Sequence, residues 1–358
     1  MRLPVFTERF HIRGVMKTIS ERFSWRTYVV FVVMLLTTML LCICIGSVNI
    51  PLKNTLTAMW NTLWGLELPA GVSKNIILNV RLPRVINVAL VGAALSLCGA
   101  AMQGLLRNPL ADGSTLGVSS GASLGAVISL AFGVSIPGLE YAGVMIMAML
   151  FAFLSLLLIL SLAYVLDRSM STNSIILIGV IFSMFTSSAM NLIITFADDH
   201  ARSIAFWTMG SFSGTNYTQS AILLATLLLC GGVILRCSRE LNAFAVGEDN
   251  ARHIGVNVKL IKLVILVTVS VMIGVCVSIS GTIGFVGLVM PHMTRMIVGP
   301  NHKRLLPSSM FSGAIFLLLA DLVARTLLSP VELSIGVVTS LVGAVAFIII
   351  FYRTRKAR

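Results

Sequence analysis

From Val29 to its end, the chain alternates between long apolar runs and short polar stretches. Each run holds about 20 residues, enough for a helix to cross a hydrocarbon core of roughly 30 Å. Backbone groups inside lipid must pair within their own segment, so we expect each run to be a helix. The pattern predicts ten spans, at residues 29–48, 85–106, 115–133, 142–165, 174–196, 218–236, 260–280, 282–298, 310–328 and 334–352.

The basic residues predict the orientation of these spans. With both termini in the cytoplasm, 20 of the 26 Lys and Arg residues fall on the inner side, as the positive-inside rule requires. The net charge of +13 therefore reflects membrane topology, and no nucleic-acid partner is predicted. We expect a multi-pass inner-membrane protein with a basic cytoplasmic tail at 1–28, one transmembrane domain at 29–353 and a short cytoplasmic tail at 354–358.

Composition narrows the class of protein further. Hydrophobic residues make up 57% of the chain and charged residues only 11%, against about 25% charged in soluble domains. The six cysteines include no C-x-x-C pair, so a zinc or redox motif is not predicted. The chain has no G-x-x-x-x-G-K-[ST] motif and therefore does not bind ATP by a P-loop. No catalytic pair occurs within the spans, so we do not expect an enzyme.

The predicted membrane interior holds few ionisable residues. His292 and Arg295 lie near the inner end of one span, and Asp321 and Arg325 near the outer end of the next. Proton-coupled carriers need such groups at membrane depth despite their cost. Asp321 and Arg325 are four residues apart, which predicts an ion pair on one helix face. Two energy sources stay open: a partner that hydrolyses ATP, or sodium, which backbone carbonyls alone can hold.

A polar stripe marks the predicted helix 174–196. Ser183, Ser187 and Asn191 are spaced four apart and share one face. Such stripes bind neighbouring helices more often than they line a path, and both interpretations stay open. Gly117 and Gly121 have the same spacing in another span, where they allow helix backbones to approach closely.

The inside loop at 237–259 has the pattern of two short helices. Ser238 is a suitable N-cap, and Gly247 can end the first helix. Glu248 then suits the start of a second helix, and Gly255 its end. The loop therefore predicts a compact cytoplasmic knob, with a solvated irregular loop as the alternative.

Three groups of segments carry a family resemblance. They are RLPR at 81–84 with NPLADG at 108–113 and LGVSSGA at 116–122; GTIGFVGLVMPHMTR at 281–295; and DLVAR at 321–325 with ELSIGVVT at 332–339. From about Arg26 onward, the chain resembles the FecCD-type permeases of ABC importers for iron siderophores and vitamin B12. It departs from the family at Ser334 and near Val345, where the family usually has proline.

The resemblance implies a ten-helix, type II ABC importer permease fold. It also implies a second permease copy, identical or related, with the translocation path between the two. Two cytoplasmic ATP-binding cassette subunits would use ATP, and a periplasmic or lipid-anchored binding protein would deliver the substrate. The permease itself binds no cofactor. Ferric siderophores are the first candidate substrates, with cobalamin or haem as alternatives.

The resemblance also assigns roles to individual residues. Docking of the binding protein falls to Arg81, Arg84 and Arg325. Coupling to the ATPase falls to Gly247, Glu248, Ala251, Gly255 and Val256. The gate and path comprise Ser171, Thr172, Ser183, Ser187 and Asn191. The structural signature consists of Asn108, Pro109, Gly117, Gly121, Gly284, Gly287, Pro291 and His292. We predict no metal site, because no second ligand stands near His292 at metal-binding spacing.

Overall fold

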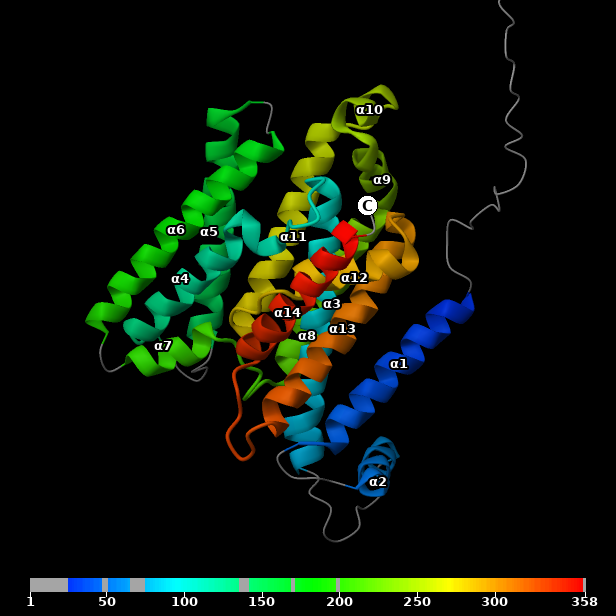
Figure 1. The fold of residues 1–358 in the computed structure, drawn as a ribbon. Coiled ribbons are helices and arrows are strands. Elements are labelled where there is room, and N and C mark those ends of the chain that lie inside the picture. Colours follow the sequence, from blue (N-terminus) through cyan, green and yellow to red (C-terminus); the bar gives the residue numbers. More distant parts are fainter. Residues whose placement is uncertain are drawn as a thin grey trace, which may run out of the picture.

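The computed structural model describes residues 25–46, 51–64, 75–134, 142–168, 171–197 and 200–356. Within these ranges the chain is helical and contains no strand (Figure 1). The predicted all-α membrane architecture is confirmed. Most of the predicted N-terminal tail, at 1–24, and the last two residues lie outside the described residues.

All ten predicted spans are helices. They are α1 (Trp25–Cys44), α3 (Leu82–Leu105), α4 (Val118–Ala131), α5 (Ala142–Leu166), α6 (Thr172–Phe196), α8 (Tyr217–Arg236), α11 (Val258–Ser280), α12 (Val286–Val298), α13 (His302–Thr326) and α14 (Ile335–Lys356). Shorter elements lie between them: α2 (Leu52–Leu63), the π-helical turn η1 (Ile76–Arg81), the 3-10 turn η2 (Gly113–Leu116), α7 (Ala201–Thr208), α9 (Ser238–Val246) and α10 (Glu248–His253).

Seven helical segments of the described chain are long and apolar enough to cross a membrane. The apolar parts of α4, α12 and α14 are shorter. Helices α4 and α12 begin late because the chain before each is irregular, at 106–112 and 281–285. The exact count of ten membrane crossings therefore stays a prediction, although every predicted segment is helical.

One predicted boundary is wrong in an informative way. The span expected to begin at residue 85 begins instead at Ile76, since η1 runs directly into α3. Pro83 fits there because the first turn of a helix has no use for its missing N–H. Arg81 and Arg84, expected just outside the span, consequently lie within the helical segment and are buried.

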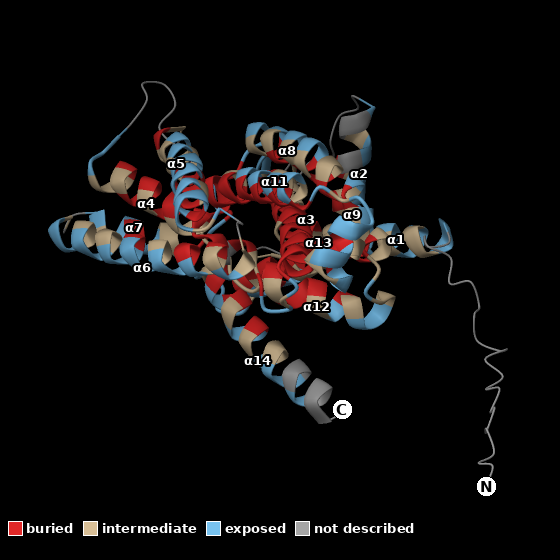
Figure 2. Cartoon of the chain, turned by 90° about the horizontal axis from the view of Figure 1, so that it is seen from above, coloured by how far each residue is buried: buried red, intermediate tan, exposed pale blue. Residues whose placement is uncertain are grey.

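Helix α3 occupies the centre of the fold. Figure 2 shows it almost wholly buried, and α8, α11, α12 and α13 pack around it. Glycines permit the closest crossings: a Cβ on Gly92 would collide with the backbone of Gly313, and one on Gly99 with that of Gly287. Small residues at such crossings let membrane helices pack backbone to backbone. The result is a dense unit of α3, α12 and α13.

The departure from the family pattern at Ser334 does not prevent a helix. Helix α14 begins at the next residue, and its first amides are satisfied from outside. Ile335 N donates to Gly210 O at 3.2 Å, and Gly336 N donates to Met209 O at 3.1 Å. These bonds replace capping by a side chain at a helix start that would otherwise leave amides unpaired.

Candidate functional site

The predicted knob is present at the end of the fold where α9 and α10 lie (Figure 1). Gly247 joins the two helices with φ 135°, and Gly255 follows the second with φ 88°. The prediction for Ser238 is wrong in detail, because Cys237 precedes α9 and Ser238 already belongs to the helix. Val246 and Ile254 are 69% and 71% exposed. Exposed apolar residues on such a protrusion suit a protein partner.

The predicted gate residues start helix α6. Ser171 is the N-cap, and its Oγ accepts a hydrogen bond from Ser174 N at 3.3 Å. Asp167, at the end of α5, accepts from Ser171 N at 3.0 Å and from Ser174 Oγ at 2.8 Å. A carboxylate at a helix N-terminus is favourable because it meets unpaired amides and the positive end of the dipole. Asp167 therefore holds the first turn of α6 to the end of α5.

The knob and the gate meet at Glu248. Its Oε1 lies 2.7 Å from Lys262 Nζ on α11 and accepts a hydrogen bond from Thr172 Oγ1 at 3.3 Å. The sequence predicts coupling for Glu248 and gating for Thr172, but it does not indicate that the two touch. Lys262 was missed altogether as a site residue.

The polar stripe lies on α6, at the edge of the fold in both views (Figures 1 and 2). Ser187 and Asn191 are exposed, while Ser183 is half-buried and donates to Gly179 O at 2.9 Å. The same helix exposes large apolar residues such as Met184 and Phe185, each 67% exposed. Within a single chain, this face of α6 is uncovered.

The three arginines that the resemblance assigns to docking, Arg81, Arg84 and Arg325, are buried within the chain. Arg84 lies 3.0 Å from Asp321 and 2.9 Å from Glu332. The predicted ion pair of Arg325 with Asp321 is present, at 2.9 Å. Arg81 donates to backbone carbonyls at the end of α1, Ile43 O at 2.6 Å and Cys44 O at 3.0 Å.

This arginine cluster also caps the C-terminus of α1. Arg325 Nη2 donates to Cys42 O at 3.1 Å, so guanidinium groups from two other helical segments satisfy carbonyls at the C-terminus of α1. Cations are favourable at that end of a helix. The arginines are thus engaged inside the chain, and the docking of a binding protein by their side chains remains a prediction.

A scan against protein-family models matches residues 34–353 to the FecCD transport family. The chain belongs to the FecCD family. This confirms the resemblance drawn from the three groups of signature segments, and the match covers almost the whole predicted transmembrane domain.

Curated relatives of this FecCD permease are similar over nearly their full length. The uncharacterized ABC transporter permease protein YvrB of Bacillus subtilis is 41% identical over 334 residues, covering 93% of this chain and 95% of the relative. The hemin transport system permease protein HmuU of Yersinia pestis is 37% identical over 327 residues, covering 89% and 95%. The chain is accordingly a permease subunit of an ABC importer.

A solved structure has the same fold. It is an inward-facing conformation of a transporter described as of the metal-chelate ABC type, with a TM-score of 0.80 and 32% sequence identity. The match covers 92% of this chain and all of that one. The FecCD permease therefore has an ABC importer permease fold.

The signature residues shape the backbone of the FecCD fold. Asn108 Oδ1 accepts from Leu110 N at 2.9 Å, which closes the turn around Pro109. Gly117 has φ 77° at the start of α4, a conformation that other residues rarely adopt. Gly121 and Gly287 lie at tight contacts: an added Cβ would collide with Ser155 at the first and with Asp112 and the backbone of Leu95 at the second. Nothing in the structure assigns a special role to Gly284.

Pro291 and His292 lie inside α12, and Pro291 is buried. The Nδ1 atom of His292 is buried without a hydrogen-bond partner. In the described part of the chain, no group of three or more His, Cys, Asp and Glu side chains is arranged to hold a metal ion. The structure therefore supplies no ligand set around His292.

One carboxylate was overlooked at depth in the FecCD fold. Asp112 lines a cavity of about 210 Å³ together with Leu95 and Cys98, which lie well inside α3. Its Oδ1 accepts from Gly113 N at 2.6 Å. A Cβ on Gly287 would collide with that oxygen, so the glycine leaves room for the carboxylate. The sequence does not indicate that this carboxylate lies inside the fold, because only the folded chain shows that the loop after α3 turns back toward that helix.

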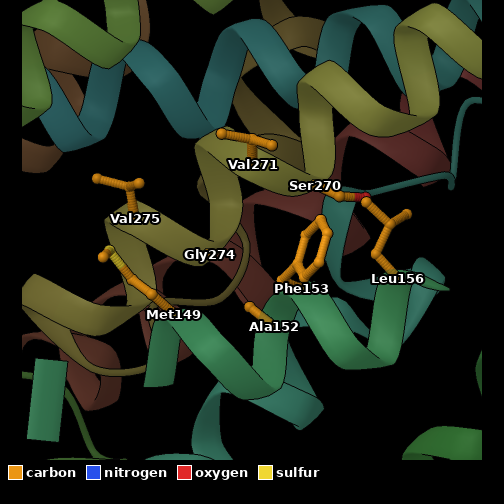
Figure 3. Close-up of a pocket in the computed structure, with 8 residues that line it drawn as sticks. All are labelled: Met149, Ala152, Phe153, Leu156, Ser270, Val271, Gly274 and Val275. Atoms are coloured by element: carbon orange, nitrogen blue, oxygen red, sulfur yellow. The ribbon is translucent and has the colours of Figure 1, made fainter. Parts of the chain in front are cut away.

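A second cavity, of about 230 Å³, lies between α5 and α11. Figure 3 shows Met149, Phe153 and Leu156 of α5 on one side and Val271 and Val275 of α11 on the other. Apart from one serine, the lining is apolar. With one serine among its lining residues, the cavity has no group of polar side chains that could bind a polar ligand.

Proposed function

We propose that this permease imports a metal chelate, with ferric siderophores as the first candidates and cobalamin or haem as alternatives. The family match over residues 34–353 carries this proposal. Similarity to a hemin permease and to a transporter of the metal-chelate type supports it. The permease performs no covalent chemistry, and ATP is used by partner subunits.

The α9–α10 knob is the proposed dock for a cytoplasmic ATP-binding cassette subunit. Val246 and Ile254 project from it, and Ala251 is fully buried beneath them. Gly255 has a φ of 88°, in the left-handed region, and ends α10. Val256 N then donates a hydrogen bond to Ala251 O at 3.0 Å. Both termini are proposed to lie in the cytoplasm as well, on the side to which the positive-inside rule assigns most Lys and Arg residues.

A second permease copy, identical or related, covers the exposed face of α6. A helix face that combines Ser187 and Asn191 with large apolar residues suits a helix partner and a polar path better than lipid alone. The translocation path then runs between the two copies, along the stripe on α6.

A periplasmic or lipid-anchored binding protein docks on the opposite face. Arg81, Arg84 and Arg325 are the candidates from sequence, but each is already engaged within the chain. Glu332 is the most exposed member of their cluster, with 38% of its side chain accessible. Direct docking on the arginines therefore requires part of this cluster to open.

Uptake into a strain that lacks this gene tests the proposal. Labelled ferric siderophores, cobalamin and haemin are each offered to cells with the restored gene. We expect accumulation of one chelate class that depends on the intact gene and on ATP. The matched control carries an ATPase subunit inactivated in its P-loop, which should abolish accumulation. Accumulation that persists in that control and follows the sodium gradient would favour the sodium-coupled carrier and overturn the proposal.

A further inference from the structure

A single carboxylate connects three elements at the knob end of the fold. Glu248 is the first residue of α10. Its Oε1 atom contacts Lys262 Nζ on α11 at 2.7 Å and Thr172 Oγ1 on α6 at 3.3 Å. The partners stand 14 and 76 residues away along the chain, so the contact exists only in the folded protein.

The two charged partners differ sharply in burial. The Lys262 side chain is 2% exposed, whereas that of Glu248 is 24% exposed. A buried ammonium is costly unless a counter-charge lies beside it. Lys262 therefore requires a carboxylate where Glu248 stands, and this requirement holds the start of α10 against α11.

Thr172 extends this contact to α6. It is the first residue of that helix, and Asp167 and Ser171 hold its first turn. The carboxylate of Glu248 lies at the positive end of the α6 dipole, where a negative charge is stabilising. A displacement of α10 thus changes an interaction at the base of the helix that carries Ser187 and Asn191.

We propose that Glu248 transmits movement of the α9–α10 knob to α6, and that Lys262 positions Glu248 for this contact. The inference rests on the proposed ATPase dock. In the ATP-dependent cycle, the partner displaces the knob. The Glu248 carboxylate carries that displacement to Thr172 and so to the polar stripe. Lys262 acts through Glu248 and touches neither substrate nor nucleotide.

The difference in burial gives a first test on the permease alone. Glu248→Gln removes the negative charge that lies 2.7 Å from the buried ammonium, while Lys262→Met leaves a carboxylate that water can reach. We expect Glu248→Gln to lower the melting temperature of the purified permease more than Lys262→Met does. The double variant should be more stable than Glu248→Gln alone. Asp249→Asn and Lys259→Met, exposed neighbours on the same helices, serve as matched controls. The pairing would be contradicted if Glu248→Gln and Lys262→Met lowered the melting temperature equally and their effects simply added in the double variant.

The second test measures transmission. A cysteine at Ser187, in a chain without its native cysteines, reports access of a membrane-impermeant thiol reagent to α6 with and without bound nucleotide. We expect a nucleotide-dependent change in labelling that Glu248→Gln and Thr172→Val abolish, and the amount of co-purified ATPase is measured in parallel for each variant. Thr172→Ser keeps the hydroxyl and should restore the change. Thr226→Val is the control, since Thr226 Oγ1 donates within its own helix, to Ile222 O at 2.8 Å.

The outcomes separate the inference from the function on which it rests. If no ATPase co-purifies with the unaltered permease, the proposed dock fails and the inference falls with it. If ATPase binding and labelling behave as expected but Glu248→Gln changes neither, the inference alone is overturned. If Glu248→Gln releases the ATPase, Glu248 belongs to the dock and transmission through it is rejected.

Discussion

Arg84 Nη2 lies 3.0 Å from Asp321 Oδ1, between the two helices α3 and α13. The Nε atom of Arg84 donates to the same oxygen at 3.1 Å, so the guanidinium group donates two hydrogen bonds to one carboxylate oxygen. Asp321 is 1% exposed, and the other oxygen faces Arg325. Asp321 is thus the carboxylate that faces both buried guanidinium groups, while Glu332 pairs with Arg84 from the more exposed side.

This arrangement predicts that Asp321→Asn severely destabilises the permease. Removing one partner of a buried ion pair typically costs about 3–5 kcal/mol, because the remaining charge has no counter-charge. Thermal unfolding in detergent should show a large drop in the melting temperature. Asp249→Asn is the control, since Asp249 pairs with Arg252 at 3.5 Å in an exposed position. A melting temperature unchanged by Asp321→Asn would contradict the internal role of the cluster.

Charge reversal at Arg84 separates an internal role from docking. Arg84→Glu places three carboxylates together, so we expect loss of folded permease in the membrane, measured by fluorescence-detected gel filtration. Lys53→Glu makes the same charge change at an exposed site on α2. If Arg84→Glu leaves the permease stable and weakens only the binding of the substrate-binding protein, the docking prediction is correct and the internal role is minor.

The backbone at Gly255 gives a third prediction. Its φ of 88° lies in the left-handed region, which costs a residue with a side chain about 1–2 kcal/mol. Gly255→Val should therefore distort the end of α10 and release the ATPase in co-purification. Gly255→Asn is the matched control, because asparagine tolerates this region and should retain the partner. Equal retention by both variants would exclude a coupling role for the turn.

Cysteine labelling tests the predicted gate and path. Single cysteines at Ser171, Thr172, Ser187 and Asn191 should react with an impermeant thiol reagent in one nucleotide state and be protected in another. State-independent burial of all four would reject the assignment.

Cys237, restored as the single cysteine in a chain without the other native cysteines, gives this experiment an internal check. Burial, and secondarily Glu240, raises the pKa of its thiol. Because the thiolate is the reactive form, Cys237 should label slowly at neutral pH and faster as the pH rises toward the raised pKa. Rapid labelling of Cys237 at neutral pH, unchanged by raising the pH, would contradict this assignment.

Much of the helical plan follows from the sequence, because the length of an apolar run is a local property. The two-helix knob also follows, since Gly247 and Gly255 mark helix ends by their own backbone requirements. The family resemblance can also be recognised from the sequence alone, because each signature segment is a short continuous stretch of residues.

Long-range pairing of charges could not be predicted in this way. The sequence alone does not bring Arg84 together with its partners, because Asp321 and Glu332 stand 237 and 248 residues away. Lys262 lies at the start of the apolar run 260–280, and a lysine there calls for a counter-charge whose identity the sequence alone does not give. Asp112 was missed because a loop that turns back into a membrane fold has the same composition as one that stays outside.

The exposed stripe on α6 bears on how the transporter is built. If the proposed second copy covers α6, a subunit that has not yet met its partner exposes Ser187 and Asn191 on a helix that also exposes Met184 and Phe185. Hydrocarbon solvates the apolar residues well and the polar ones poorly. Pairing of subunits would then remove these polar side chains from hydrocarbon. A subunit made in excess of its partner should therefore be degraded faster than a paired one.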